Sequence, residues 1–252
     1  MDYLFFSFLV TILIQMLGFI IAFMKKTDKL TDMFYGLGFI VLAGYWFFQG
    51  QHDLFRTLLF FMIILWAIRL SVFLFIRISK IKKDDRFDAM RQSFFRFGGF
   101  WLLQAVAIFV ISLSFVIALQ KKDMQVAALS AFGLCVWVSG FIIEGISDYQ
   151  KFKFKQANSG FIKTGLWKYS RHPNYFGEIL CWVGVYIYCV PLFFGLEHLA
   201  IVSPVFIASL LIFVSGIPIL EKNADIRYGK DKQYLEYKKK TSVLILLPPK
   251  SD

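Results

Sequence analysis

The chain has 252 residues, of which 58% are hydrophobic and 19% aromatic, and its formal net charge is +11. A soluble domain is usually closer to half apolar, so this composition excludes an ordinary soluble globular protein and favours one that lies in a membrane. The positive charge does not indicate a nucleic-acid partner, because it is divided among short segments between apolar runs.

Apolar runs long enough to cross a membrane recur along the whole chain. A helix needs roughly 20 apolar residues to span the hydrocarbon core, and runs of this length are too long for barrel strands. We therefore expect an all-α integral membrane protein, a bundle of seven transmembrane helices that forms a single domain over residues 1–252. The expected spans are residues 4–24, 31–49, 54–76, 97–119, 125–145, 174–195 and 199–220.

The basic residues are distributed unevenly about these spans. In a seven-span arrangement, 24 of the 28 Lys and Arg residues fall on one side of the membrane. The positive-inside rule assigns that side to the cytoplasm, so we expect the N-terminus outside and the C-terminus in the cytoplasm. The loops expected outside are short, and we expect this face to carry little function. They comprise residues 49–53, 120–124 and 195–198.

Composition also limits the kinds of site. The three cysteines fall inside expected spans and the three histidines are scattered, so we expect neither disulfides nor a metal centre. There is no Walker motif and no Gly-x-Gly-x-x-Gly after a strand. The segments between spans are too short for a separate nucleotide-binding fold. If a nucleotide binds, helix ends and loops must form its site.

Polar residues in the first four spans need partners. Asp32 and Tyr35 share one face of the second span. Arg69 lies one turn after Trp66 in the third span, and a cation this deep must be paired or line a wet cavity. Asp32 is a plausible partner, so these residues form either a structural ion pair beside an interfacial aromatic ring or part of a site. Gln104 is expected to hydrogen-bond to another helix or, second, to contact a substrate.

Two carboxylates lie at the end of the fifth span. Glu144 and Asp148 are four residues apart and share a helix face, where like charges repel. They therefore require a shared partner. That partner is a ribose diol or an amide of a ligand, or it is Arg69 or a lysine in an ion pair within the bundle.

The start of the sixth span carries the densest polar motif of the chain. Pro173 suits the first position of a helix, whose free N–H groups and positive dipole end form a natural anion site. Arg171 adds a group that can fork onto a phosphate. Asn174 and Glu178 share a face deeper in the membrane. A positively flanked helix start with one inward glutamate is the simpler alternative, but polar groups this dense usually bind something. The motif residues are Tyr169, Arg171, His172, Asn174, Tyr175 and Glu178.

Basic and aromatic residues alternate in the tail, over residues 221–241. This pattern is typical of a helix on an anionic membrane surface, and it also suits a lid over an anionic cofactor. Pro218, just before it, is expected to bend the end of the seventh span.

These motifs resemble those of the steroid 5-alpha-reductase family, and most closely its bacterial branch of DUF1295 proteins. The string Ser-Arg-His-Pro-Asn-Tyr-x-Gly-Glu within residues 170–178 is specific to that family. Its weaker core, Arg-His-Pro-x-Tyr-x-Gly, and the tail pattern with Tyr234 and Tyr237 also occur in the more distantly related isoprenylcysteine carboxyl methyltransferases and in phospholipid methyltransferases.

The resemblance implies an NADPH-dependent reductase of a bacterial inner membrane that passes a hydride to the C=C bond of a hydrophobic enone such as a 3-oxo-Δ4-steroid. Residues 1–120 would mainly form the substrate cavity, and residues 121–252 would mainly bind the cofactor at the cytoplasmic side. The partners would be the substrate and membrane lipids, and the chain would act as a monomer. The cofactor residues implied are Arg77, Arg86, Glu144, Asp148, Tyr169, Arg171, His172, Asn174, Tyr175, Glu178, Arg227, Tyr234 and Tyr237.

The residues that polarise the substrate depart from the family pattern. The eukaryotic enzymes use a glutamate on an early helix and a tyrosine on the next, but here the third span has no tyrosine and the second has no glutamate. We therefore assign the catalytic role to Asp32 and Tyr35, and substrate contacts to Trp66 and Gln104. The alternatives are an S-adenosylmethionine-dependent membrane methyltransferase and a non-catalytic sterol-binding protein.

Overall fold

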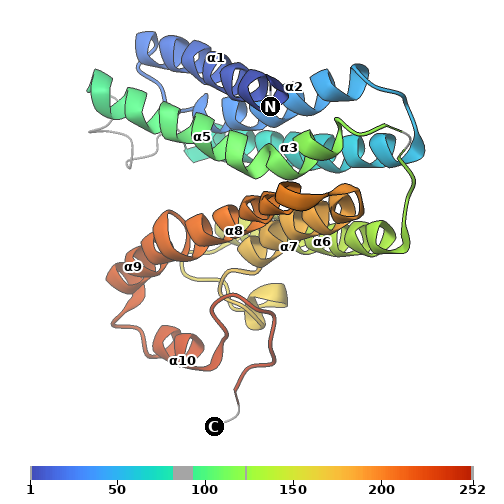
Figure 1. The fold of residues 1–252 in the computed structure, drawn as a ribbon. Coiled ribbons are helices and arrows are strands. Elements are labelled where there is room, and N and C mark those ends of the chain that lie inside the picture. The colour runs from blue at the N-terminus through green and yellow to red at the C-terminus, as the bar shows by residue number, and fades with distance from the viewer. Residues whose placement is uncertain (1, 82–92, 123, 251–252) are drawn as a thin grey trace. The chain divides into compact units, whose positions relative to one another are not determined.

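The computed structural model describes residues 2–81, 93–122 and 124–250, with the side chains of residues 77–81 outside this description. Figure 1 shows a chain made mainly of helices joined by loops, and Ser170 and Ser242 form an isolated parallel bridge. Shorter 3-10 and π segments connect some of the helices. The α-helices are α1 (Asp2–Met24), α2 (Thr31–Phe48), α3 (Leu54–Ile81), α5 (Phe94–Ala118), α6 (Ala128–Ala157), α7 (Pro173–Cys189), α8 (Val202–Ser209), α9 (Ile217–Tyr228) and α10 (Lys232–Lys240).

Among the described residues, seven helical segments are long and apolar enough to cross a membrane. This confirms the predicted number of spans, and most of the bounds agree to within a few residues. The fifth helix runs well beyond its predicted end, and the seventh segment starts earlier and ends later than predicted because short helices extend it at both ends. The segments are Asp2–Met24, Thr31–Phe48, Leu54–Ile76, Phe94–Ala118, Ala128–Ala157, Pro173–Leu192 and Gly195–Tyr228.

The chain divides into two compact units. Unit 1 comprises Met1–Ala131 and Val185–Ser203, and unit 2 comprises Phe132–Gly184 and Pro204–Asp252. Unit 1 therefore contains α1, α2, α3 and α5 with the end of α7. Unit 2 contains most of α6 and α7, together with α9, α10 and the C-terminal tail.

In unit 1, α1 buries small and polar side chains and exposes large apolar ones. Ser7, Thr11 and Gln15 recur every four residues and are almost fully buried. The hydroxyl of Ser7 accepts a hydrogen bond from Trp46 Nε1 at 2.9 Å, and Gln15 Nε2 donates to the carbonyl of Phe34 at 2.9 Å. Since lipid is as apolar as leucine, membrane helices associate through such polar and small groups.

The second helix of unit 1, α2, contacts α1, α3 and α5. Two glycines allow this close packing. A Cβ atom at Gly36 would overlap the hydroxyl of Ser71 on α3, and one at Gly38 would lie 2.8 Å from Ile108 on α5. The helix that carries Asp32 and Tyr35 is therefore held between its neighbours with little free space.

In unit 2, α6 and α7 approach backbone to backbone through glycines. A Cβ atom at Gly177 would lie 2.6 Å from the backbone N of Glu144, and one at Gly140 would lie 2.6 Å from the carbonyl O of Gly177. Further along α7, a Cβ atom at Gly184 would lie 2.6 Å from the backbone N of Trp137. This contact seats Glu144 against the first turns of α7, the part that carries the polar motif.

The seventh membrane segment breaks before its end, as Pro218 led us to expect. A π turn over Leu210–Val214 closes with a hydrogen bond from Ser215 N to Leu210 O at 2.8 Å. The chain then changes direction at Gly216, and α9 starts with Pro218 in its first turn, where the missing N–H is not needed.

The α6–α7 contact makes a prediction about stability. Gly177→Ala should lower the free energy of unfolding by about 2 kcal/mol, because its Cβ would meet backbone that cannot move aside cheaply. Thermal unfolding in detergent measures this. The control is Gly44→Ala on α2, where a Cβ meets nothing within 4 Å. Equal midpoints for the two variants would contradict the prediction.

Candidate functional site

The C-terminal tail runs alongside the polar motif that precedes α7. Arg171 N donates to the carbonyl of Ser242 at 2.8 Å, and Leu247 N donates to the carbonyl of Tyr169 at 3.1 Å. The buried hydroxyl of Ser170 donates to Leu244 O at 2.7 Å. These bonds give hydrogen-bond partners to backbone groups that would otherwise be removed from water without one. They also bring α10 next to the motif.

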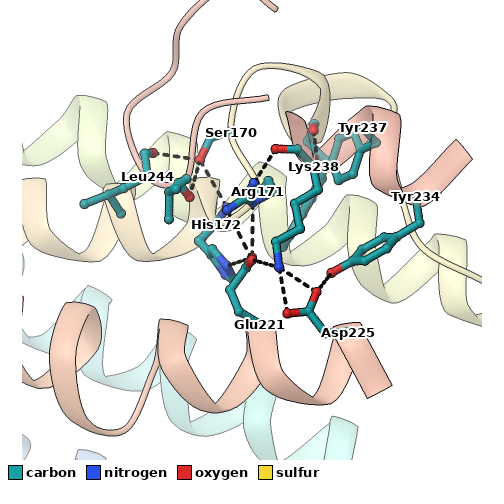
Figure 2. A network of polar contacts seen from close by, with 11 residues as sticks. Ser170, Arg171, His172, Glu221, Asp225, Tyr234, Tyr237, Lys238 and Leu244 are labelled. Carbon is teal, nitrogen blue, oxygen red and sulfur yellow. Dashed lines mark hydrogen bonds and ion pairs between the residues drawn. The ribbon is translucent and has the colours of Figure 1, made fainter. Parts of the chain in front are cut away.

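Glu221 on α9 lies at the centre of an ion-pair network (Figure 2). Its carboxylate oxygens lie 3.2 and 3.1 Å from Arg171 Nε and Nη2, 2.9 Å from His172 Nε2 and 3.3 Å from Lys238 Nζ. The Glu221 side chain is 18% exposed, and that of His172 is 6% exposed. Two helices and the motif are therefore linked through one largely buried carboxylate.

A second carboxylate extends this network. Asp225, one turn after Glu221, accepts from Lys238 Nζ at 2.5 and 2.7 Å and from the Tyr234 hydroxyl at 2.9 Å. Arg171 Nη1 donates to the carbonyl of Lys238 at 2.5 Å. All three guanidinium nitrogens of Arg171 thus make contacts within the protein, and these contacts hold the tail against the motif.

Aromatic side chains from the tail pack around Phe161 in the loop between α6 and α7. The rings of Tyr228, Tyr234 and Tyr237 have centroids 5.2 to 5.6 Å from that of Phe161. The Tyr237 hydroxyl donates to Trp167 O at 2.7 Å. Burial raises the pKa of Tyr234 and Tyr237, so both phenols remain hydrogen-bond donors at neutral pH.

These groups surround a pocket of about 300 Å³ in unit 2. This volume is at the lower end of the range for ligand sites, roughly 300–1,000 Å³. Cationic and aromatic side chains dominate its lining, and one carboxylate, Glu221, also lines it. Those that bear on ligand binding are Lys151, Lys155, Phe161, Trp167, Arg171, His172, Arg227, Tyr228, Tyr234 and Tyr237.

Two polar atoms of the motif before and at the start of α7 have no hydrogen-bond partner among the described residues, and one of them belongs to a residue that lines this pocket. They are His172 Nδ1 and Asn174 Oδ1, and both are buried. Burial lowers the pKa of His172 more than the contact with Glu221 raises it, so the neutral ring is favoured. With Nε2 facing Glu221 as donor, Nδ1 is an acceptor. His172 therefore offers one acceptor to a ligand in the pocket, and Asn174 offers a second acceptor at the start of α7.

The structure brings five of the predicted cofactor residues to one pocket: Arg171, His172, Arg227, Tyr234 and Tyr237. Glu144 and Asp148 are buried on α6, and Cys181 Sγ lies 4.0 Å from the Glu144 carboxylate. Asn174 and Glu178 lie on the first turns of α7, where Tyr175 stacks on His172 with centroids 5.7 Å apart. Tyr169 is 40% exposed, on the edge of the motif.

Two predicted cofactor residues cannot be placed in this way. Arg77 lies on α3, and its side chain is outside the described ones. Arg86 lies outside the described residues.

The predicted substrate residues lie in unit 1. Tyr35 and Trp66 both contact Phe39. The ring centroid of Phe39 lies 5.2 Å from that of Tyr35 and 5.3 Å from that of Trp66. Gln104 Nε2 donates to the carbonyl of Thr31, beside Asp32, at 3.0 Å. This bond joins α5 to the start of α2, which is the first of the two roles expected for Gln104.

Several residues of this site escaped prediction from sequence. Glu221 and Asp225 form the same i,i+4 carboxylate pair as Glu144 and Asp148, and that spacing was the available signal. Lys238 is the first of three consecutive lysines, and the sequence does not indicate which of them is paired. Phe161 and Trp167 lie in a loop whose position no pattern indicates.

The network predicts a large effect of one neutral substitution. Glu221→Gln should lower the free energy of unfolding by about 2 kcal/mol, because it leaves Arg171 and His172 without their carboxylate; partial exposure makes this less than for a fully buried pair. Denaturant unfolding in detergent tests it. Glu236→Gln, which breaks the exposed pair with Lys240, is the matched control and should change stability by less than about 0.5 kcal/mol. Comparable losses in the two variants would rule out a central role for Glu221.

Comparison with known proteins gives one match. The family model of DUF1295, described as proteins of unknown function, matches residues 18–241. No curated protein and no solved structure matches the chain. Because the model covers most of the chain, including α2 to α10, this protein belongs to the DUF1295 family.

Proposed function

We propose that this protein is an NADPH-dependent membrane reductase that acts on the C=C bond of a hydrophobic enone, as steroid 5-alpha-reductases do. The observation that carries the proposal is the pocket in unit 2, where cations and aromatic rings surround about 300 Å³. A dinucleotide has phosphates that attract cations and flat rings that stack on aromatic side chains. The proposal also places this pocket at the cytoplasmic side, on the basis of the positive-inside rule.

The residues present fit one part of a dinucleotide. Lys155 and Arg227 supply positive charge, and Phe161 and Tyr228 supply flat apolar surface. The acceptors His172 Nδ1 and Asn174 Oδ1 would receive hydrogen bonds from hydroxyl or amide groups. We assign the ribose hydroxyls to Glu144 and Asp148, and an amide contact to Glu178 with Asn174. A pocket of this size would hold a nucleotide half and not the whole cofactor.

The reaction divides between two groups of residues. Bound NADPH would supply a hydride to the β-carbon of the enone. In unit 1, Tyr35 and Asp32 would polarise the ketone oxygen by hydrogen bonding, which favours the charge that develops on that oxygen as the hydride arrives. A proton then adds to the α-carbon to complete the saturated ketone. Trp66 and Gln104 would line the substrate site.

One observation favours a second candidate. Arg171 is neutralised by Glu221, so fewer cations are available to phosphates than the sequence suggests. S-adenosylmethionine is itself a cation without phosphate, and a membrane methyltransferase would need fewer arginines. The two functions predict different ligands for the same pocket.

Ligand-dependent stability separates these functions. NADPH should raise the thermal midpoint of the detergent-purified protein, and S-adenosylmethionine should not, because a ligand that binds the folded state stabilises it. Arg227→Gln and Ala224→Phe, which remove a cation and fill the pocket, should each weaken NADPH binding about tenfold. Lys222→Gln, on the same helix and outside the lining, is the control. A rise in the thermal midpoint with S-adenosylmethionine and not with NADPH would favour the methyltransferase over the reductase.

Turnover tests the assigned acid groups. Asp32→Asn and Tyr35→Phe should lower kcat for enone-dependent NADPH oxidation by about 100-fold and leave the NADPH-induced thermal shift unchanged. Tyr45→Phe, also on α2, should retain activity. Parent rates in both variants would remove Asp32 and Tyr35 from the mechanism. NADPH binding without turnover of any enone would favour a non-catalytic sterol-binding protein.

A further inference from the structure

A second pocket lies within unit 1, at the end of the bundle where α2 ends, α3 begins and α5 ends. Its volume is about 450 Å³. The loops that form it include two of those expected from the sequence to carry little function. Its polar lining includes Gln49, Asp53, Arg56, Gln120, Lys121 and Lys122.

Arg56 is a buried cation whose hydrogen bonds, among the described residues, go to neutral carbonyl groups. It is 3% exposed, and its Nη1 and Nη2 donate to the carbonyls of Trp46 and Lys121 at 2.8 and 3.1 Å. Its Nε is buried and has no partner among the described residues. Two of five N–H donors are thus used, and carbonyls carry no net charge to balance the guanidinium. A buried cation left in this state is costly unless an anion joins it.

The carboxylates near Arg56 have other roles. Asp53 Oδ1 accepts from the backbone N of Arg56 at 2.8 Å and so caps the start of α3, and its charge attracts the Arg56 guanidinium without a direct ion pair. No carboxylate of the described residues forms an ion pair with the Arg56 guanidinium. Glu197 pairs instead with Lys121 Nζ at 2.5 and 2.7 Å and accepts from Phe194 N at 2.9 Å. The cations left for a ligand are therefore Arg56 and the exposed Lys122.

The backbone is shaped to admit the guanidinium. A Cβ atom at Gly50 would overlap the guanidinium carbon and both terminal nitrogens of Arg56. Only glycine therefore allows Arg56 this position against the loop between α2 and α3. The backbone of the loop therefore fixes the position of the Arg56 guanidinium in the pocket.

The position of the pocket indicates the class of ligand. Phe48, Leu54 and Ala118 mark the ends of three membrane-spanning segments, so the pocket lies at the level of lipid headgroups. Tyr45 and Trp46 also line it, and such aromatic residues are enriched at that level. We propose that this pocket binds the phosphate group of an anionic phospholipid, with Arg56 and Lys122 on the phosphate and the glutamine amides near the headgroup hydroxyls.

Lipid-dependent stability and native mass spectrometry of the full chain in neutral detergent test this proposal. Phosphatidylglycerol should bind and raise the thermal midpoint more than phosphatidylcholine does. Arg56→Gln should weaken phosphatidylglycerol binding about tenfold, and Lys122→Gln should weaken it severalfold. Since Arg56→Gln can impair folding, Gly50→Ala provides a second variant that displaces the guanidinium and keeps its charge. Lys25→Gln, an exposed lysine beyond the other end of α1, is the control and should leave binding unchanged.

Binding of inorganic phosphate distinguishes a site for free phosphate from a site for the phosphate of a lipid headgroup. A stabilisation by millimolar phosphate that Arg56→Gln removes would support the site and identify free phosphate as a ligand. Equal binding of the two lipids, or binding that the Arg56 and Gly50 variants retain in full, would overturn the proposal. Asp123 lies outside the described residues. If phosphate or lipid bound only to Asp123→Asn, that carboxylate would be the counter-charge of Arg56 and the proposal would fail.

Discussion

The contact of the Glu221 carboxylate with Arg171, His172 and Lys238 is the interaction on which unit 2 most depends. A charged or polar group removed from water is stable only with a partner, so each of these four groups limits where the others can lie. The loop before α7, helix α9 and helix α10 are joined as a result. The aromatic lining of the pocket depends on this connection. Tyr234 and Tyr237 lie on α10, and their rings contact Phe161 only while α10 keeps its position beside the loop.

A membrane environment explains how the rest of the scaffold places polar groups. Because lipid gives no hydrophobic reason for helices to associate, several helix contacts are made through glycines and small polar residues, and α1 turns its large apolar side chains outward. The glycine contact of α6 with α7 is one consequence. It brings the buried Glu144 next to the start of α7 at a distance that larger side chains would forbid. Close packing and the chemistry of the site are therefore parts of the same arrangement.

The sequence predicts the helices well and the site only in part. Span number and most bounds follow from the length of apolar runs, a local property with a strong physical signal. Asn174 and Glu178 share a face of α7 because helix geometry requires it. The partner of Arg171 could not be predicted, because Glu221 lies 50 residues away and only the fold brings the two together. The pocket at Arg56 was missed for the same reason: short loops say nothing about which carbonyls converge on one side chain.

Which cations remain after internal pairing decides what each pocket can bind. Net charge does not answer this, since Arg171 and Lys121 count fully toward it and are both neutralised by glutamates. In unit 2 the exposed Arg227 is the cation best placed to meet a ligand, beside aromatic rings that suit a nucleotide base. In unit 1 the Arg56 side chain hydrogen-bonds to carbonyls among the described residues, beside aromatic residues typical of a membrane interface. The neighbours of each cation are therefore the reason why we propose a stacking anion such as a nucleotide at one pocket and a lipid headgroup at the other.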